Sequence, residues 1–192
     1  MTYMIIGIIL FLATHSVRLF ADGWRSRTIA AIGEPKWKGV YSLLSLAGFV
    51  LLVWGYGEAR LAPMVLYNPP LFTRHIAGLL MLLSFILLAA ANVPGNAIKA
   101  GIGHPMVAGV KVWAFAHLLA NGTLADVLLF GSFLAWAIVN FVASRKRDRA
   151  AGVNYPRGDA KQLVLTIGAG TAMWAVFAFW LHRILIGVAP FG

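Results

Sequence analysis

The residues best suited to chemistry lie in an apolar stretch, residues 103–122, which reads GHPMVAGVKVWAFAHLLANG. It holds His104, Lys111, His117 and Asn121. On a helix, His104 and Lys111 point one way, and His117 and Asn121 point to a face about 120° away. A neutral imidazole can hydrogen-bond a carbonyl of a neighbouring helix, or it can give a lone pair to iron. Both interpretations stay open from the residues alone.

A second candidate is the stretch ATHSVRLFAD at residues 13–22. His15 and Arg18 are three residues apart, and Arg18 and Asp22 are four apart, so a helix would align all three on one stripe. One interpretation is an interfacial Arg18–Asp22 pair with His15 hydrogen-bonded above it. The other makes His15 a metal or haem ligand, with Arg18 placed for a propionate or another anion.

The remaining polar and aromatic residues have simpler explanations. His75 and His182 each adjoin an arginine at the end of an apolar run, where interfacial solvation accounts for them. Large aromatic residues are frequent, and they pack in cores and interfacial belts or line a groove for a long apolar substrate. They include Trp113, Phe115, Trp136, Trp174, Phe177, Phe179 and Trp180.

The composition sets the environment in which these residues work. Of the 192 residues 60% are hydrophobic and 11% charged, and the mean hydropathy is +0.81. Soluble domains carry about a quarter charged residues, so the chain is predicted to be an integral membrane protein bound to a lipid bilayer. The net charge is +10, and the basic residues that produce it gather at the ends of apolar runs. This placement is typical of membrane topology signals, so no nucleic-acid partner is predicted. The lack of cysteine excludes disulfides, iron–sulfur clusters, zinc–thiolate sites and CxxCH haem attachment.

Six apolar runs of about bilayer length predict an all-α polytopic helix bundle. They lie at residues 2–20, 40–58, 75–93, 105–120, 124–143 and 163–187. The first, third and fifth loops hold most of the 16 lysines and arginines, so both termini are predicted to lie outside the cytoplasm. The first run lacks a basic start and a cleavage site, which predicts a retained anchor. Asn121 and Gly122 end one helix, and Thr123 and Asp126 suit a capping box for the next.

Four segments carry a resemblance to a known family. HSVR, RHIAGLLMLLSFILLAAA, GHPMVAGVKVWAFAHLLANG and LLFGSFLAWAIVN make the chain resemble the NnrU family of bacterial membrane proteins over nearly its whole length. The resemblance implies one integral membrane domain over residues 1–192 in the bacterial inner membrane. Bacterial members are linked to denitrification, around nitrite and nitric oxide reductase activity. The plant relative is 15-cis-zeta-carotene isomerase, a haem b membrane enzyme that isomerises a polyene double bond.

The resemblance also implies a cofactor site. The histidines that match the haem ligands of the plant relative are His15 and His117, so both are expected to bind the iron of haem b. Lys111, Arg18 and Asn121 are expected around the haem as propionate or polar partners. His15 is predicted near the cytoplasmic end of its span, whereas His117 lies about 20 Å along its span from His104, so the two are predicted at different depths. A deeper start of the fourth span or a strong tilt of the helices would remove this difference. Pairing of His15 with His104 stays open as an alternative.

One departure from the plant relative limits the chemistry. The plant enzyme has a cysteine three residues before the second histidine, which serves as an alternative ligand when the redox state changes. Ala114 stands at that position here, so a thiolate exchange is impossible. The expected function is a haem b membrane protein that isomerises a polyene, with enzyme activity left open. The alternative is an accessory membrane protein of denitrification, with haem or without a cofactor, and with no isomerase activity.

Overall fold

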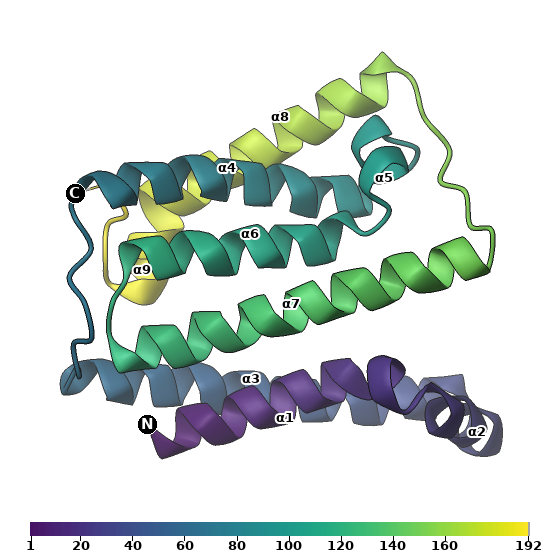
Figure 1. The fold of residues 1–192 in the computed structure, drawn as a ribbon, viewed down its shortest axis with the longest axis horizontal. Helices are drawn as coiled ribbons and strands as arrows, with labels where there is room; N and C mark the ends of the chain where they lie inside the picture. The colour runs from purple at the N-terminus through teal and green to yellow at the C-terminus, as the bar shows by residue number, and fades with distance from the viewer. Residues whose placement is uncertain (192) are drawn as a thin grey trace. The chain divides into compact units, whose positions relative to one another are not determined.

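The computed structural model describes residues 1–191, and their regular structure is helical (Figure 1). Among these residues the only β-structure is an isolated bridge between Val65 and Thr123. The helices are α1 (Thr2–Phe20), α2 (Asp22–Ile32), α3 (Glu34–Leu61), α4 (Phe72–Asn92), α5 (Ala97–Ile102), α6 (Pro105–Ala120), α7 (Leu124–Ala150), α8 (Ala160–Val176), the π-helix η1 (Phe177–Leu181) and α9 (His182–Ile186). The predicted all-α fold is confirmed.

The long helices are suited to a bilayer. Within the described residues, five helical runs are long and apolar enough to cross a membrane: α1, α3, α4, α7 and the continuous run Ala160–Ile186. Helix α6 is shorter, with 16 residues. At 1.5 Å per residue it spans about 24 Å, somewhat less than a hydrocarbon core of about 30 Å. The chain is therefore a polytopic membrane protein, and α6 corresponds to the shortest and most polar predicted span.

The predicted spans match these helices, with differences at the ends. Residues 2–20 and 105–120 coincide with α1 and α6, whereas α3 and α7 run past the predicted residues 40–58 and 124–143. The extensions are polar helical turns, which a hydropathy pattern does not predict. Contacts such as the ion pair between Glu34 and Lys38 (2.8 Å) stabilise them. The short helices α2 and α5 were not predicted, because neither is an apolar run of bilayer length.

The chain divides into two compact units. Unit 1 comprises Met1–Leu66 and Thr123–Ser132, and unit 2 comprises Tyr67–Gly122 and the residues from Phe133 onward. Helix α7 contributes residues to both units. A single domain over residues 1–192 therefore stays a prediction.

Unit 1 is built on an antiparallel pair, α1 and α3, in which the backbones touch (Figure 1). A Cβ added to Gly7 would lie 2.3 Å from the backbone nitrogen of Leu52, and one on Gly55 would lie 2.1 Å from that of Met4. No real side chain tolerates such distances. Glycine at these positions lets the two helices approach closely. In a bilayer there is no hydrophobic driving force between helices, so their association depends on such close packing.

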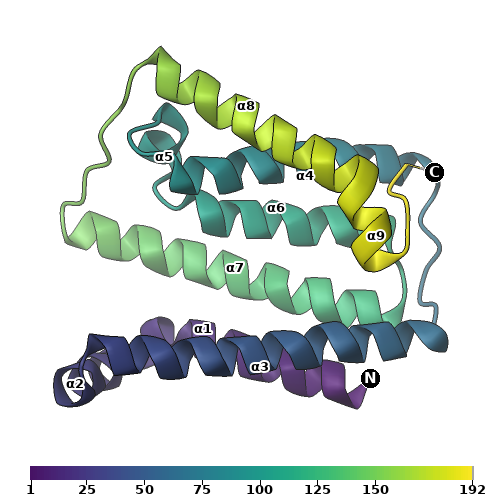
Figure 2. The ribbon, with the colours of Figure 1, turned by 180° about the vertical axis from the view of Figure 1, so that it is seen from behind.

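In unit 2, helix α4 packs against both α6 and α8, as the view from behind shows (Figure 2). Two polar contacts join these helices. The hydroxyl of Ser84 on α4 donates to the carbonyl of Gly109 on α6 (2.9 Å), and the Trp174 indole on α8 donates to the carbonyl of Gly78 on α4 (3.1 Å). Bonds between helices satisfy polar groups that hydrocarbon would leave unpaired.

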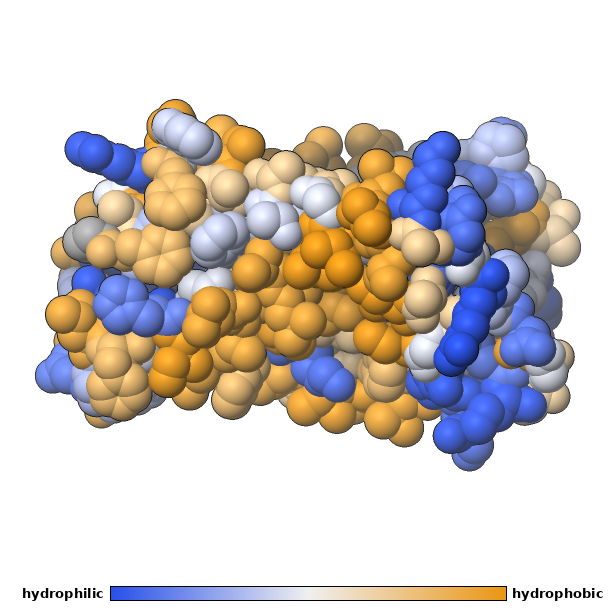
Figure 3. Space-filling view, turned by 90° about the horizontal axis from the view of Figure 1, so that it is seen from above, coloured by the Kyte–Doolittle hydropathy of each residue, from blue (hydrophilic) through white to orange (hydrophobic). Residues whose placement is uncertain are grey.

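One face of unit 2, formed by α4 and α8, is apolar. Leu79 on α4 and Val164 on α8 are 69% and 70% exposed. Figure 3 shows hydrophobic side chains over the middle of this face, with hydrophilic side chains gathered toward its ends. A surface of this kind is unsuited to water and matches lipid tails.

The predicted capping box at the start of α7 is confirmed. The Thr123 amide and hydroxyl both donate to Oδ2 of Asp126 (2.9 and 2.7 Å), and the Asp126 amide donates back to the Thr123 hydroxyl (3.3 Å). The Asp126 carboxylate also has a donor from another helix, which the sequence did not reveal. The hydroxyl of Tyr56 on α3 donates to Oδ1 of Asp126 (2.6 Å), so one buried carboxylate caps the start of α7 and ties it to α3.

The close approach of α1 and α3 predicts that substitution of two glycines of α3 has very different effects on stability. We expect Gly55→Ala to lower the free energy of unfolding by about 1–3 kcal/mol, because the new methyl group meets the backbone at Met4. Gly57→Ala is the control, since a Cβ there has nothing within 4 Å. SDS-induced unfolding in mixed micelles measures both variants, and equal losses would contradict the packing.

The Asp126 cap predicts a second stability effect. We expect Asp126→Ala to lower the free energy of unfolding by about 2 kcal/mol, because the helix loses its cap and the Tyr56 hydroxyl loses its acceptor. Tyr56→Phe removes only the second contact and should cost about 1 kcal/mol. If Tyr56→Phe were as damaging as Asp126→Ala in the same unfolding experiment, the capping role would be wrong.

Candidate functional site

His117 lies in the last turn of α6, held by its own helix. Its Nδ1 is 2.8 Å from the backbone carbonyl oxygen of Trp113. A carbonyl oxygen can only accept, so Nδ1 carries the proton, and in the neutral ring Nε2 carries the lone pair. The Trp113 indole lies against the imidazole, with ring centroids 5.3 Å apart, and packs edge-on against Phe133 of α7 at 5.5 Å. The chain therefore sets both the tautomer and the surroundings of this histidine.

Asn121 serves mainly to end α6. Its side-chain amide and its backbone amide both donate to the carbonyl of His117 (2.9 Å each), so one residue satisfies this oxygen twice at the helix end. The Tyr67 hydroxyl donates to the Asn121 carbonyl (2.7 Å) and to that of Leu118. The following residue, Gly122, lies so close to Tyr67 that a Cβ would be 1.9 Å from the Tyr67 carbonyl oxygen. This network fixes the end of α6 directly behind His117.

His15 on α1 has the same local arrangement as His117. Its Nδ1 is 2.8 Å from the carbonyl oxygen of Phe11, so the proton again lies on Nδ1 and the lone pair on Nε2. The ring stacks on Phe11 at 4.1 Å between centroids and meets the Tyr41 ring edge-on at 5.4 Å. In both histidines, which belong to different units, Nδ1 donates to the backbone carbonyl four residues back.

The predicted stripe of His15, Arg18 and Asp22 is wrong at its last member. Helix α1 ends at Phe20, and Ala21, at φ −138° and ψ 38°, separates it from α2. Asp22 opens α2 and forms its ion pair with Arg25 at 3.6 Å. The helical spacing used for Arg18 and Asp22 does not apply across a break in the helix. Arg18 shares α1 with His15, three residues away.

His104 precedes α6 and lies in a polar cluster that sequence reasoning missed. Its Nε2 is 2.8 Å from Oδ2 of Asp148 on α7, and the Tyr155 hydroxyl donates to the same oxygen (2.9 Å). Burial and the Asp148 carboxylate raise the pKa of Tyr155. A carboxylate behind a histidine is also a common arrangement behind metal ligands, in which case the second ring nitrogen, Nδ1, would bind. The lone acidic residue in the basic run SRKRDR was the available signal.

Another contact holds this cluster together at Gly103, whose φ is +79°. A Cβ there would lie 2.6 Å from Nη1 of Arg145 and 3.3 Å from the Tyr155 ring. The left-handed backbone favours glycine at this position, and the missing side chain leaves room for Arg145 and Tyr155.

A groove of about 250 Å³ lies beside Trp113, whose indole packs against His117, and we call it the Trp113 groove. It is lined by Met81, Ser84, Phe85, Leu88, Val110, Trp113 and Phe177. The rings of Phe85 and Phe177 are 5.6 Å apart, and the one hydroxyl in the lining, that of Ser84, is already bonded to Gly109. Phe177 opens the π-helix, a distortion that is frequent at functional sites. The groove suits a flat apolar chain.

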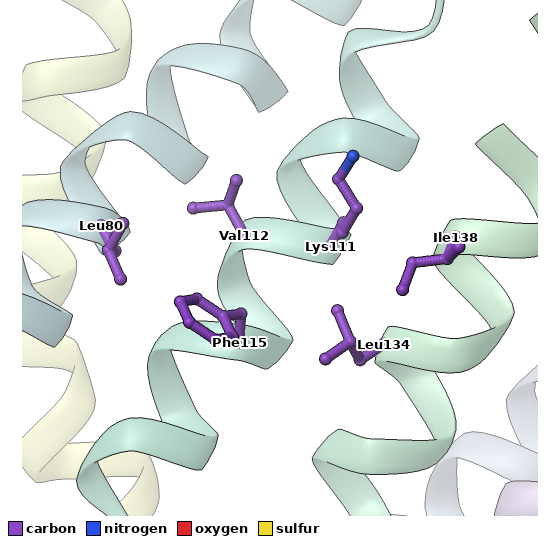
Figure 4. Close-up of a pocket in the computed structure, with 6 residues that line it drawn as sticks. All are labelled: Leu80, Lys111, Val112, Phe115, Leu134 and Ile138. Atoms are coloured by element: carbon purple, nitrogen blue, oxygen red, sulfur yellow. The ribbon is translucent and has the colours of Figure 1, made fainter. Parts of the chain in front are cut away.

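Lys111 lies elsewhere, in a second groove of about 320 Å³ that we call the Lys111 groove (Figure 4). The other lining residues are Leu80, Val112, Phe115, Leu134 and Ile138. None of them also lines the Trp113 groove. The ammonium lies over the Phe141 ring, 4.7 Å from its centroid. Of the predicted aromatic set, Trp113 and Phe177 line the first groove, and Phe115 lines the second.

His75 and His182 differ from the histidines above. Nδ1 of His182 donates to the carbonyl of Val188 (2.6 Å), and His75 lies parallel to the Phe191 ring with centroids 6.3 Å apart. Both contacts involve the C-terminal segment. They agree with a packing role at the ends of spans.

The comparisons with known proteins give one result. A family model described as NnrU protein matches residues 3–190. No curated protein and no protein of solved structure matches the chain. A match over nearly the whole length is sufficient for assignment, and the chain belongs to the NnrU family.

Proposed function

We propose that this protein is a haem b-binding protein of the bacterial inner membrane that isomerises a double bond of a long polyene. The axial ligands in this proposal are His117 and His15. The main support is that His117, whose Nε2 carries the lone pair, adjoins an apolar aromatic groove through Trp113. The likeness of these histidines to the haem ligands of the plant carotene isomerase supports the same assignment.

The donor groups present suit haem iron. Metal-binding histidines usually donate their other ring N–H to a carbonyl or carboxylate, which orients the ring and fixes the tautomer. His15 and His117 both do so, to the carbonyls of Phe11 and Trp113. Arg18, one turn from His15, is the proposed partner of a propionate, and Asn121 supports His117 by ending its helix. His15 and His117 belong to different units, so their pairing comes from the resemblance.

The division of labour between cofactor and chain is simple. Haem b, when bound, supplies ferrous iron that can perturb a carbon–carbon double bond. The chain orients the two imidazoles and holds the polyene flat against Trp113, Phe85 and Phe177. Ala114 is fully buried on α6 and offers no ligating atom, so any change of ligand here uses a residue other than cysteine.

The haem assignment predicts the absorption spectra of four histidine variants. We expect purified protein to show a Soret band with sharp α and β bands on reduction, and His15→Ala and His117→Ala to lose them because an axial ligand is gone. His182→Ala is the matched control, because its ring also donates to a backbone carbonyl. A protein that takes up no haem would contradict the proposal. If His104→Ala lost these bands and His117→Ala kept them, His104 would be the second axial ligand in place of His117.

Binding of the polyene in the Trp113 groove predicts that substitution of two phenylalanines has different effects on kcat/KM. We expect Phe177→Ala to lower kcat/KM for a cis-polyene about tenfold while the Soret band is unchanged, because part of the apolar contact is lost. Phe115→Ala is the control, since Phe115 lines the other groove. Haem bands without any polyene turnover would instead favour a haem-containing accessory protein of denitrification.

A further inference from the structure

We propose that the Lys111 groove binds an anionic phospholipid, with its phosphate on the Lys111 ammonium and part of one acyl chain along the apolar lining. The inference goes beyond the proposed function, because this groove shares no lining residue with the Trp113 groove.

The charge of Lys111 favours an anionic ligand in this groove. A lysine within a membrane span is costly and usually has a partner. Around Lys111 the groove lining is otherwise apolar, and the ammonium contacts the face of Phe141. Within residues 1–191, the ion pairs formed by the acidic groups go to Arg25, Lys38 and His104, and none goes to Lys111. A negatively charged group from outside the chain would complete the site.

The groove runs from a cationic end to an apolar end along α7. Phe141, which marks the position of the ammonium, lies four residues before Arg145, or about 6 Å along the helix. Arg145 begins the basic end of α7, which continues with Lys146, Arg147 and Arg149. Leu134 lies seven residues before Phe141, or about 10 Å farther from that end. The groove is therefore cationic near the basic end of the helix and apolar away from it, which is the polarity of a phospholipid.

The access and the size of the groove suit part of a lipid. Figure 4 shows the side chains from α4, α6 and α7 around one hollow, with the lysine nitrogen at its edge. Its 320 Å³ is at the small end of ligand sites, about 300–1,000 Å³, so it fits part of one acyl chain and leaves the rest in the bilayer. Anionic headgroups gather at basic membrane flanks, so a phospholipid is the occupant that this location favours.

The test measures retained lipid on the full-length protein by native mass spectrometry. Protein in mixed micelles is offered phosphatidylglycerol and phosphatidylcholine of equal chain length. We expect preferential retention of phosphatidylglycerol, and we expect Lys111→Met to lower it about fivefold, the effect of one cation near a headgroup. Lys111→Arg should retain the preference, and Lys146→Met is the control for a nearby cation outside the groove.

A second variant tests the apolar part. Leu134→Trp should fill the groove and lower retention of phosphatidylglycerol while the ammonium is unchanged. Circular dichroism checks that each variant is folded. Equal losses in Lys146→Met and Lys111→Met would overturn the proposal in favour of diffuse charge attraction, and equal retention of both lipids by the wild type would overturn it outright. Displacement of the phospholipid by oleate at equal concentration would identify a fatty-acid site instead.

The same variants separate this proposal from the haem assignment. If Lys111→Met lost the Soret band and kept its phosphatidylglycerol, Lys111 would be the propionate partner predicted from the sequence, and the lipid proposal would be wrong. If the protein bound no haem but showed the lipid preference, the lipid proposal would stand without the proposed function.

Discussion

The structure depends on the need to satisfy polar groups inside the chain, because hydrocarbon offers them no partner. Hydroxyls within the helices bond to carbonyls one turn back, as Thr14 does to Leu10 and Thr166 to Gln162, each at 2.7 Å. His15 and His117 follow the same rule with their Nδ1 atoms. For a hydroxyl, this bond only satisfies a polar group that lipid would leave unpaired. For an imidazole it also decides which ring nitrogen carries the proton and which carries the lone pair.

The same environment explains how the helices pack. Apolar side chains gain little by leaving lipid for protein, so contact energy must come from close approach and from bonds between helices. Gly7 and Gly55 bring α1 and α3 to backbone contact, and Ser84 bonds α4 to α6 at Gly109. Buried small residues on α6, including Ala114 and Ala116, leave its bulky and polar residues to define the two grooves.

Helix α6 carries most of the candidate chemistry because it presents residues in several directions. Trp113 and Val110 line one groove, and Lys111 and Val112 line the other. Its start carries His104 beside Asp148, and its end carries His117 with Asn121 behind it. A short helix with neighbours on more than one side can hold polar residues that a lipid-facing helix would expel.

The sequence by itself determined the class of fold, the positions of the spans and the cap of α7. These follow from hydropathy, from charge placement and from the spacing of Thr123 and Asp126, which are all local properties of the chain. It also singled out His15, His117 and Lys111, because ionisable residues within spans are rare.

Only the tertiary structure decided how these residues are grouped. It separated Lys111 from the Trp113 groove, gave His104 the partners Asp148 and Tyr155, and broke the helix between Arg18 and Asp22. Spacing along one helix gives directions within that helix only. What stands opposite each side chain depends on the packing of segments far apart in the sequence, which hydropathy and periodicity do not encode.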